Sequence, residues 1–108
     1  MHAAYWKYVV TRRLTGEKRG SFALKGSNWF ARPTADEDSW RADLRLLEDC
    51  HRRLRAAVAS LDARTLARTA HESSSVLSLV SGIVAHDVYH AGQIQLIKRL
   101  MQARASGE

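Results

Sequence analysis

The stretch His86-Asp87-Val88-Tyr89-His90-Ala91-Gly92-Gln93-Ile94 decides the fold and the candidate chemistry of this chain. It places two histidines four residues apart, inside a segment with helical periodicity. Positions i and i+4 of a helix lie on one face, one above the other, so both imidazoles would point the same way. Two nitrogens held in this manner can bind a single divalent metal ion. A third histidine, His2, lies near the start of another helical segment and strengthens this interpretation.

A long helix is predicted around this stretch. It begins between Ser73 and Ser75, because a serine side chain can accept a hydrogen bond from the free N–H groups of a first turn. The residues expected on its inward face are Leu79, Ile83, His86, His90, Ile94 and Ile97. Gly82 and Gly92 lie inside the helix, where glycine costs about 1 kcal/mol relative to alanine. Either Gly82 leaves room beside a metal ion, or both glycines permit close helix packing.

Two further helices are predicted before it. The first spans residues 2 to about 15, with Gly16 well placed to end it. The second follows Thr34-Ala35-Asp36-Glu37, which matches a capping box led by Thr34, and it ends near Asp62. Its inward seam has alternating spacings of four and three residues and comprises Trp40, Leu44, Leu47, His51, Leu54, Val58 and Leu61. Such a seam packs against other helices at shallow angles.

The loop between the first two helices and a histidine in the second helix each allow two interpretations. The segment from Gly16 to Pro33 is a long loop, which either covers one end of a bundle or packs on the surface through Trp29 and Phe30. His51 interrupts the apolar seam of the second helix. A histidine in that position is more often a satisfied core residue than a metal ligand, although it could also lie close to a metal.

Length and composition predict a single domain over residues 1–108 and exclude some classes of protein. No apolar run is long enough to cross a membrane, and Met1-His2 does not begin a signal segment. The single cysteine, Cys50, excludes an internal disulfide framework and fits a reducing cytoplasm. We therefore expect a cytoplasmic protein without a membrane partner.

The chain is basic, with a formal net charge of +6, and arginine supplies 13 of its 17 positive side chains. Such a charge is compatible with nucleic-acid binding, since phosphates are contacted largely by arginine and lysine. The arginines are nevertheless spread along the chain, mostly at spacings that place them opposite the apolar stripes. A solvated helix face explains them better, so nucleic-acid binding is the less favoured interpretation.

The pattern His86-Asp-x-Tyr-His90-x-Gly92-Gln93-Ile94 resembles the closing motif of the DinB-like (damage-inducible) metalloprotein superfamily. The start is similar too, because His2 is followed by aromatic residues and a run ending in RLTGE, as in that family's second helix. The resemblance implies an all-α, up-and-down helical bundle of the DinB-like four-helix type. This chain would supply three main helices, with the long loop between the first two.

The resemblance also implies a site and a range of activities. Carried onto this sequence, the three histidine ligands of a divalent metal ion are His2, His86 and His90. Family members include thiol-dependent S-transferases, isomerases and proteins described as metal-dependent hydrolases, which act on small-molecule substrates and in some cases use a low-molecular-weight thiol. The family's helix before the first ligand has no counterpart here, so the domain looks N-terminally short. Either a second copy completes the bundle in a homodimer, or the chain is a shortened form of a longer protein.

Three neutral imidazoles would leave the cation doubly charged and at least one coordination position open, as in catalytic sites. Metal-bound water or thiolate would then be the nucleophile. Nitrogen ligands suit Zn, Ni, Co, Cu or Fe, and their spacing cannot choose among these metals. Gln93, three residues beyond His90, is a candidate outer partner, whereas Tyr89 is expected to pack and Asp87 to lie on the surface or between helices. No inward carboxylate is evident as a general base.

Two other classes of function remain open. One is a non-enzymatic helical module that dimerises through its apolar seam and keeps a structural or vestigial metal site. The other is a nucleic-acid binder that uses Arg52, Arg53 and Arg55 and shows a steep dependence on salt. The first is distinguished from an enzyme by whether a metal is bound with an open coordination position.

Overall fold

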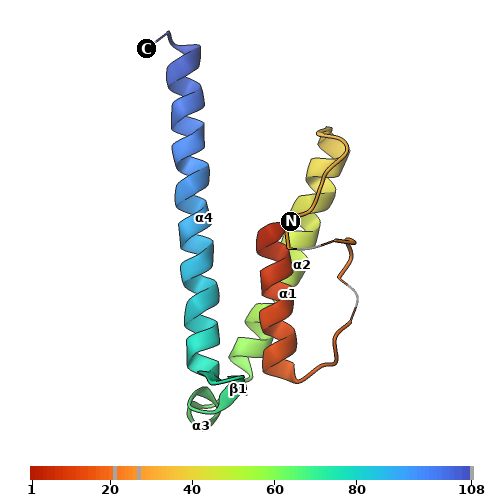
Figure 1. Cartoon of the computed structure of the whole chain (residues 1–108), viewed down its shortest axis with the longest axis vertical. Coiled ribbons are helices and arrows are strands. Elements are labelled where there is room, and N and C mark those ends of the chain that lie inside the picture. Colours follow the sequence, from red (N-terminus) through yellow and green to blue (C-terminus); the bar gives the residue numbers. More distant parts are fainter. Residues whose placement is uncertain (21, 27, 108) are drawn as a thin grey trace.

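The computed structural model describes residues 1–20, 22–26 and 28–107, and three long helices dominate it (Figure 1). Its elements in chain order are α1 (His2–Thr15), α2 (Glu37–Ala59), α3 (Ala63–Leu66), β1 (Thr69–His71), β2 (Ser74–Ser75) and α4 (Val76–Ala105). The predicted all-α bundle with three main helices is therefore confirmed. No helix in the described part of the chain combines the length and the apolar character needed to span a bilayer.

The start and end of α1 agree with the sequence prediction. The helix ends at Thr15, and Gly16 follows it in the left-handed conformation with φ of 71°. Glycine adopts this conformation without steric cost, which makes it the usual residue after a helix C-terminus.

The start of α2 differs from the prediction. The N-cap is Asp36, whose carboxylate accepts a hydrogen bond from the Ser39 N–H at 2.7 Å. Thr34 instead pairs with the Ser39 hydroxyl at 2.9 Å, so the predicted capping box is wrong. The hydrogen bonds to Ser39 and Thr34 also lower the pKa of Asp36. Asp36 lies two residues closer to the helix than Thr34, and its ionised carboxylate is a better acceptor for the N–H groups of the first turn than a hydroxyl.

The segment between α2 and α4 contains structure that the sequence analysis missed. α2 ends at Ala59, and Asp62 caps the short α3 by accepting from the Thr65 N–H at 2.7 Å. β1 and β2 then form a small antiparallel hairpin with Glu72 at a φ of 51° in its turn. Ser75 caps α4, as one of the three predicted serines.

The core joins the three long helices through one residue of each: Val10 of α1, Leu54 of α2 and Ile83 of α4. Half-buried side chains packed around them are Trp6, Leu14, Val58 and Leu79. Leu54, a member of the predicted inward seam of α2, is only 6% exposed. The same seam does lie open further toward the start of α2, where Trp40 and Leu44 are exposed.

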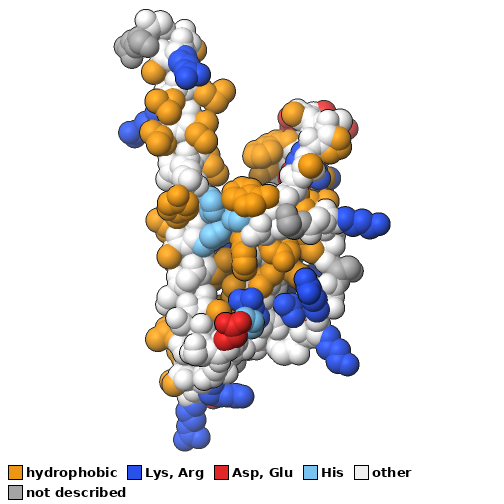
Figure 2. Space-filling view, viewed as in Figure 1, with side chains coloured by type: hydrophobic (Ala, Val, Ile, Leu, Met, Phe, Trp, Pro, Cys, Tyr) orange, Lys and Arg blue, Asp and Glu red, His pale blue; other side chains and the backbone are white. Residues whose placement is uncertain are grey.

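The second half of α4 extends beyond the other helices (Figure 1). Every residue from 91 to 102 is exposed. The large apolar side chains among them are Ile94, Leu96, Ile97, Leu100 and Met101, and Figure 2 shows apolar side chains spread along this helix. A helix that is apolar on several sides normally packs against more than one neighbour. The exposed apolar surface of this chain thus lies mainly on α4.

Candidate metal centre

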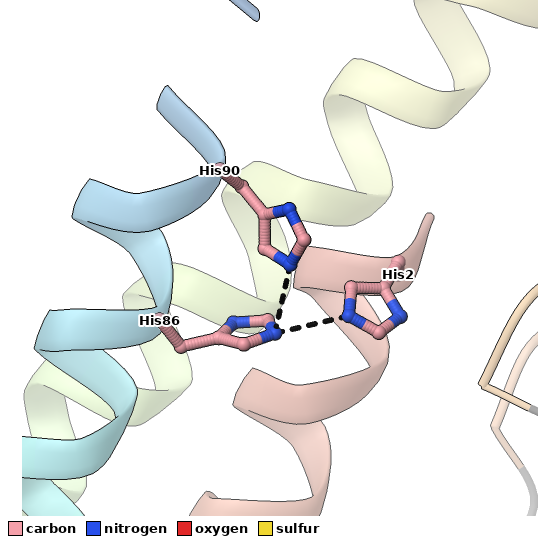
Figure 3. Close-up of side chains that lie close together, drawn as sticks. All are labelled: His2, His86 and His90. Carbon is pink, nitrogen blue, oxygen red and sulfur yellow. Dashed lines mark hydrogen bonds between the residues drawn. The ribbon is translucent and has the colours of Figure 1, made fainter. Parts of the chain in front are cut away.

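Three histidines from opposite ends of the chain come together between α1 and α4 (Figure 3). His2 lies in the first turn of α1, and His86 and His90 lie one turn apart on α4. The His86 Nε2 atom is 3.0 Å from Nε2 of His2 and 3.1 Å from Nε2 of His90. The three nitrogens converge on one point, so the structure brings together all three residues singled out in the sequence.

A hydrogen bond from the His2 ring to the backbone determines which of its two nitrogens carries the proton. Its Nδ1 lies 2.9 Å from the backbone carbonyl oxygen of Asn28, which can only accept a hydrogen bond. Nδ1 must therefore donate, and the neutral ring presents the lone pair of Nε2 toward His86. The sequence analysis did not identify Asn28, because a backbone carbonyl in a long loop leaves no sequence signal.

His90 is oriented in the same way by a side chain. Its Nδ1 lies 2.7 Å from Oε1 of Gln93, and the amide Nε2 of Gln93 donates to the Tyr89 hydroxyl at 3.2 Å. The Gln93 side chain thus contacts the second nitrogen of His90, at the position suggested for it from the sequence. Tyr89 was expected only to pack, whereas its hydroxyl accepts a hydrogen bond that fixes the Gln93 amide. Nε2 of His90 also presents a lone pair toward His86.

These hydrogen bonds make the centre of the cluster electron-rich. Two lone pairs, from His2 and His90, point at His86 Nε2, and a neutral His86 has at most one proton to place there. One proton can serve only one of the two lone pairs. Among the described residues, Nδ1 of His86 is buried and has no hydrogen-bond partner. The arrangement fits a cation that accepts all three lone pairs better than it fits three uncomplexed rings.

The electrostatic surroundings keep His86 neutral. Burial lowers the pKa of His86 below its ordinary value of 6.5, and the neighbouring His90 and His2 rings lower it further. A neutral imidazole is the form that binds a metal ion, because protonation removes the lone pair. The cluster therefore favours the metal-binding form of its central residue at neutral pH.

The long loop before α2 covers one side of the cluster. Trp29 stacks on the His2 ring with centroids 3.9 Å apart and planes 10° from parallel. Phe30 packs edge-on against Tyr5 at 5.7 Å. Both aromatic residues expected to hold this loop do contact α1, although residues 21 and 27 lie outside the described residues. The loop therefore packs on the surface of α1 and also forms a wall of the candidate site.

A half-buried ion pair lies next to the histidines. Lys7 of α1 is only 4% exposed, and its ammonium group pairs with the carboxylate of Asp87 on α4. Asp87 therefore links two helices, which is one of the two positions predicted for it. Among the described residues, no carboxylate joins the cluster of three histidines.

Two grooves border the cluster. A groove of about 600 Å³ between α1, α2 and α4 is lined by His51 and His90, with Leu44, Leu47 and Ile94 among its apolar residues. His51 is exposed and lies outside the cluster of three, so it is neither a core residue nor part of the candidate ligand set.

A smaller pocket of about 280 Å³ is lined by Gly82 together with Trp6 and His86. A Cβ atom placed on Gly82 or Gly92 would meet no atom within 4 Å. Close helix packing is therefore the wrong explanation for both glycines. Open space does lie beside His86, and the absence of a side chain at Gly82 contributes to it.

The fold and the site together define an all-α bundle protein with a candidate metal centre made of three histidines. The chain belongs to the DinB superfamily, whose family model matches residues 1–94, so the resemblance seen in the sequence is confirmed. Members of this superfamily generally bind metal ions. No curated protein and no solved structure matches the chain significantly.

Proposed function

We propose that this chain is a metal-dependent enzyme, of the thiol S-transferase or hydrolase type, in which His2, His86 and His90 bind one divalent ion. The observation that carries the proposal is the convergence of two lone pairs on His86 Nε2, at 3.0 and 3.1 Å. An all-nitrogen ligand set suits Zn, Ni or another transition metal. When bound, the ion would supply the Lewis acidity that makes a water molecule or a thiol nucleophilic near neutral pH.

The protein's own residues orient the ligands and exclude water. The Asn28 carbonyl and the Gln93 side chain hold two of the imidazoles in one tautomer, and outer partners of this kind raise metal affinity. Trp29 covers His2 on the loop side, and Trp6 lies edge-on to His2 and His86 at 6.4 and 6.3 Å. These rings restrict access from the loop side of the cluster.

The groove beside His90 is the proposed substrate site. Its volume of about 600 Å³ falls in the range of small-molecule sites. Leu44, Leu47 and Ile94 would contact an apolar part of the substrate, and Lys7 and Asp87 line the groove close to the histidines. A small molecule or thiol adduct seated there would have one end at His90. Cys50 is free and buried, which fits the reducing cytoplasm proposed for this activity.

Elemental metal analysis of untagged protein tests the proposal. We expect about one metal ion per chain in the wild type, and none in a His86→Ala/His90→Ala variant. His71→Ala is the matched control, because His71 lies on β1 and outside the cluster. Protein that binds no Zn or Ni, even when the metal is added, would refute the proposal. A loaded site would then be assayed for thiol transfer and for hydrolysis.

A second candidate function, a helical module that forms homodimers, is favoured by the exposed end of α4. This end of α4, residues 91–105, is called the overhang here, and it carries Lys98, Arg99 and Arg104. Residues 88–107 contain no acidic side chain. The first half of α2 is acidic and carries Glu37, Asp38, Asp43, Glu48 and Asp49 against only two arginines. The basic, apolar overhang of one copy would therefore pack along the acidic, open start of α2 in a second copy.

The oligomeric state tests this second candidate. Size-exclusion chromatography with light scattering should show a dimer, and Ile97→Lys/Met101→Lys should make it a monomer. Gln95→Lys/Gln102→Lys adds the same charge to the other side of the helix and should leave the dimer intact. If the wild-type chain stays monomeric at a protein concentration of about 100 micromolar, the dimer hypothesis is wrong.

A further inference from the structure

A third pocket lies along α1, on the side covered by the loop, and none of the three histidines lines it. Its volume is about 560 Å³. Four positive side chains line it, two from α1 and two from the loop: Arg12, Arg13, Arg19 and Lys25. Aromatic rings supply much of the remaining wall, namely Tyr5, Trp6, Tyr8 and Phe22. Apart from Trp6, none of its lining residues takes part in the proposed metal centre.

The wall of the pocket is held in place by specific contacts. The Tyr8 hydroxyl donates a hydrogen bond to the Gly20 carbonyl at 2.7 Å, which ties the loop to α1. Phe22 packs against both Tyr5 and Tyr8, with centroids 5.5 Å apart in each pair. A Cβ on Gly20 would meet the Tyr8 hydroxyl at 3.4 Å, so the loop approaches the helix closely there. These contacts place Arg19 and Lys25 around the same space as the two α1 arginines.

The charges in this pocket are not compensated by the described part of the protein. Other cations of the chain form ion pairs, as Lys7, Arg32 and Arg41 do. Among the described residues, no carboxylate lies within 4.0 Å of any of the four cations of the pocket, and none lines it. The Nε atoms of Arg12 and Arg13 are buried and have no hydrogen-bond partner there. Like charges gathered in one pocket repel each other unless an anion joins them.

We propose that this pocket binds a small organic phosphate, with its phosphoryl groups on the arginines and a flat ring against the tyrosine and phenylalanine rings. Guanidinium groups recognise phosphate oxygens through paired hydrogen bonds. The pocket volume fits a small ligand.

The site is distinct from the candidate metal centre. Arg13 follows His2 by eleven residues on α1, which is roughly 16 Å along the helix axis. Trp6 lies between the two sites, because it lines this pocket and also contacts the rings of His2 and His86. None of the three histidines lines this pocket, so the proposal does not rest on metal binding.

Isothermal titration with ADP tests the proposal, with adenosine and pyrophosphate as the two halves of the probe. We expect ADP to bind at least tenfold more tightly than either half. Arg13→Gln/Arg19→Gln should weaken ADP binding at least tenfold. Arg45→Gln/Arg55→Gln removes the same charge from exposed positions on α2 and should leave the affinity unchanged. His86→Ala should also leave it unchanged, which separates this site from the metal centre.

Several outcomes would overturn the proposal. One is the absence of ADP binding to wild-type protein whose fold is verified by circular dichroism. Another is an equal loss of affinity in both arginine double variants, since that result would indicate attraction by net charge alone. A third is binding of single-stranded oligonucleotides that strengthens with their length, because it would indicate an extended nucleic-acid surface rather than a pocket.

Discussion

The two halves of α4 present the same helical face to very different surroundings. In residues 76–90 this face contains Ile83, which is 5% exposed in the core, and the two histidines of the candidate metal centre. In residues 91–105 it continues through Ile94, Ile97 and Met101, which are 55–66% exposed. The family match ends at residue 94, close to the point where the surroundings change.

The difference shows that apolar periodicity determines which face of a helix can be buried, but not whether a partner covers it. α1 begins at His2, beside His86 and His90, and α4 runs on past that level (Figure 1). Side chains of the first half therefore contribute to stability and site geometry, whereas those of the second half remain available for association. The following predictions test this contrast, beginning with the largest effect.

Truncation of the shared face should have opposite consequences in the two halves. Ile83→Ala should lower the free energy of unfolding by about 3 kcal/mol, because it leaves a cavity in the core. Ile97→Ala should change it by less than about 0.5 kcal/mol in the monomer, since the side chain is already in water. Urea unfolding at low protein concentration measures both. Equal losses in the two variants would break the comparison.

The second largest effect on stability should come from the ion pair between Lys7 and Asp87, which lies in the first half of α4. Asp87→Asn should destabilise the fold by about 2 kcal/mol, because it leaves the buried Lys7 ammonium group without its counter-charge. Combining it with Lys7→Met should recover most of this loss, since no buried charge then remains. Thermal unfolding of the single and double variants gives the answer. A double variant no more stable than Asp87→Asn would contradict the explanation.

The orientation of His90 should have a smaller effect, visible in metal affinity. Gln93→Ala removes the acceptor from His90 Nδ1 and should weaken Zn binding about tenfold, as loss of outer partners does elsewhere. Gln95→Ala is the matched control, because Gln95 is exposed and lies outside these contacts. Competition titration with a zinc indicator compares the two. Equal affinities would show that Gln93 does not act through His90.

The smallest effect should be the pH dependence of the metal-free protein. Because the pKa of His86 is lowered in the folded chain, the unfolded chain binds a proton first as the pH falls. This contribution to stability is complete above the ordinary value of 6.5 and declines as the pH falls below it. Urea unfolding between pH 7.5 and 5 should show the decline, and His86→Ala should reduce its slope. An unchanged slope would assign the effect to other groups.

The sequence predicted those features that depend on local geometry. The extent of α1 and its end at Gly16 follow from residue preferences within one turn. The proximity of His86 to His90 follows from the pitch of a single helix. The position of His2 beside them was implied by the family resemblance, because no local pattern relates residues 84 positions apart.

Features that depend on competition or on tertiary contact were not predicted. Thr34 and Asp36 both precede α2 and can both act as caps, and only the backbone geometry selects Asp36. The stacking of Trp29 on His2 joins side chains whose meeting no periodicity specifies. The hydrogen bond from Gln93 to Tyr89 is an i, i+4 contact within one helix, which the helical pitch permits but the sequence analysis did not identify. The hairpin of β1 and β2 is too short to produce an alternating pattern.

The distance along the chain between His2 and His86 has a further consequence. An ion bound to both would join positions 84 residues apart and would close a loop that contains most of the molecule. A covalent cross-link over a loop of comparable length stabilises a fold by roughly 4–5 kcal/mol, through the lost freedom of the unfolded chain. A metal ion here would therefore act as a reversible cross-link between α1 and α4. Adding a chelator should release α1 first and make the long loop accessible to proteases.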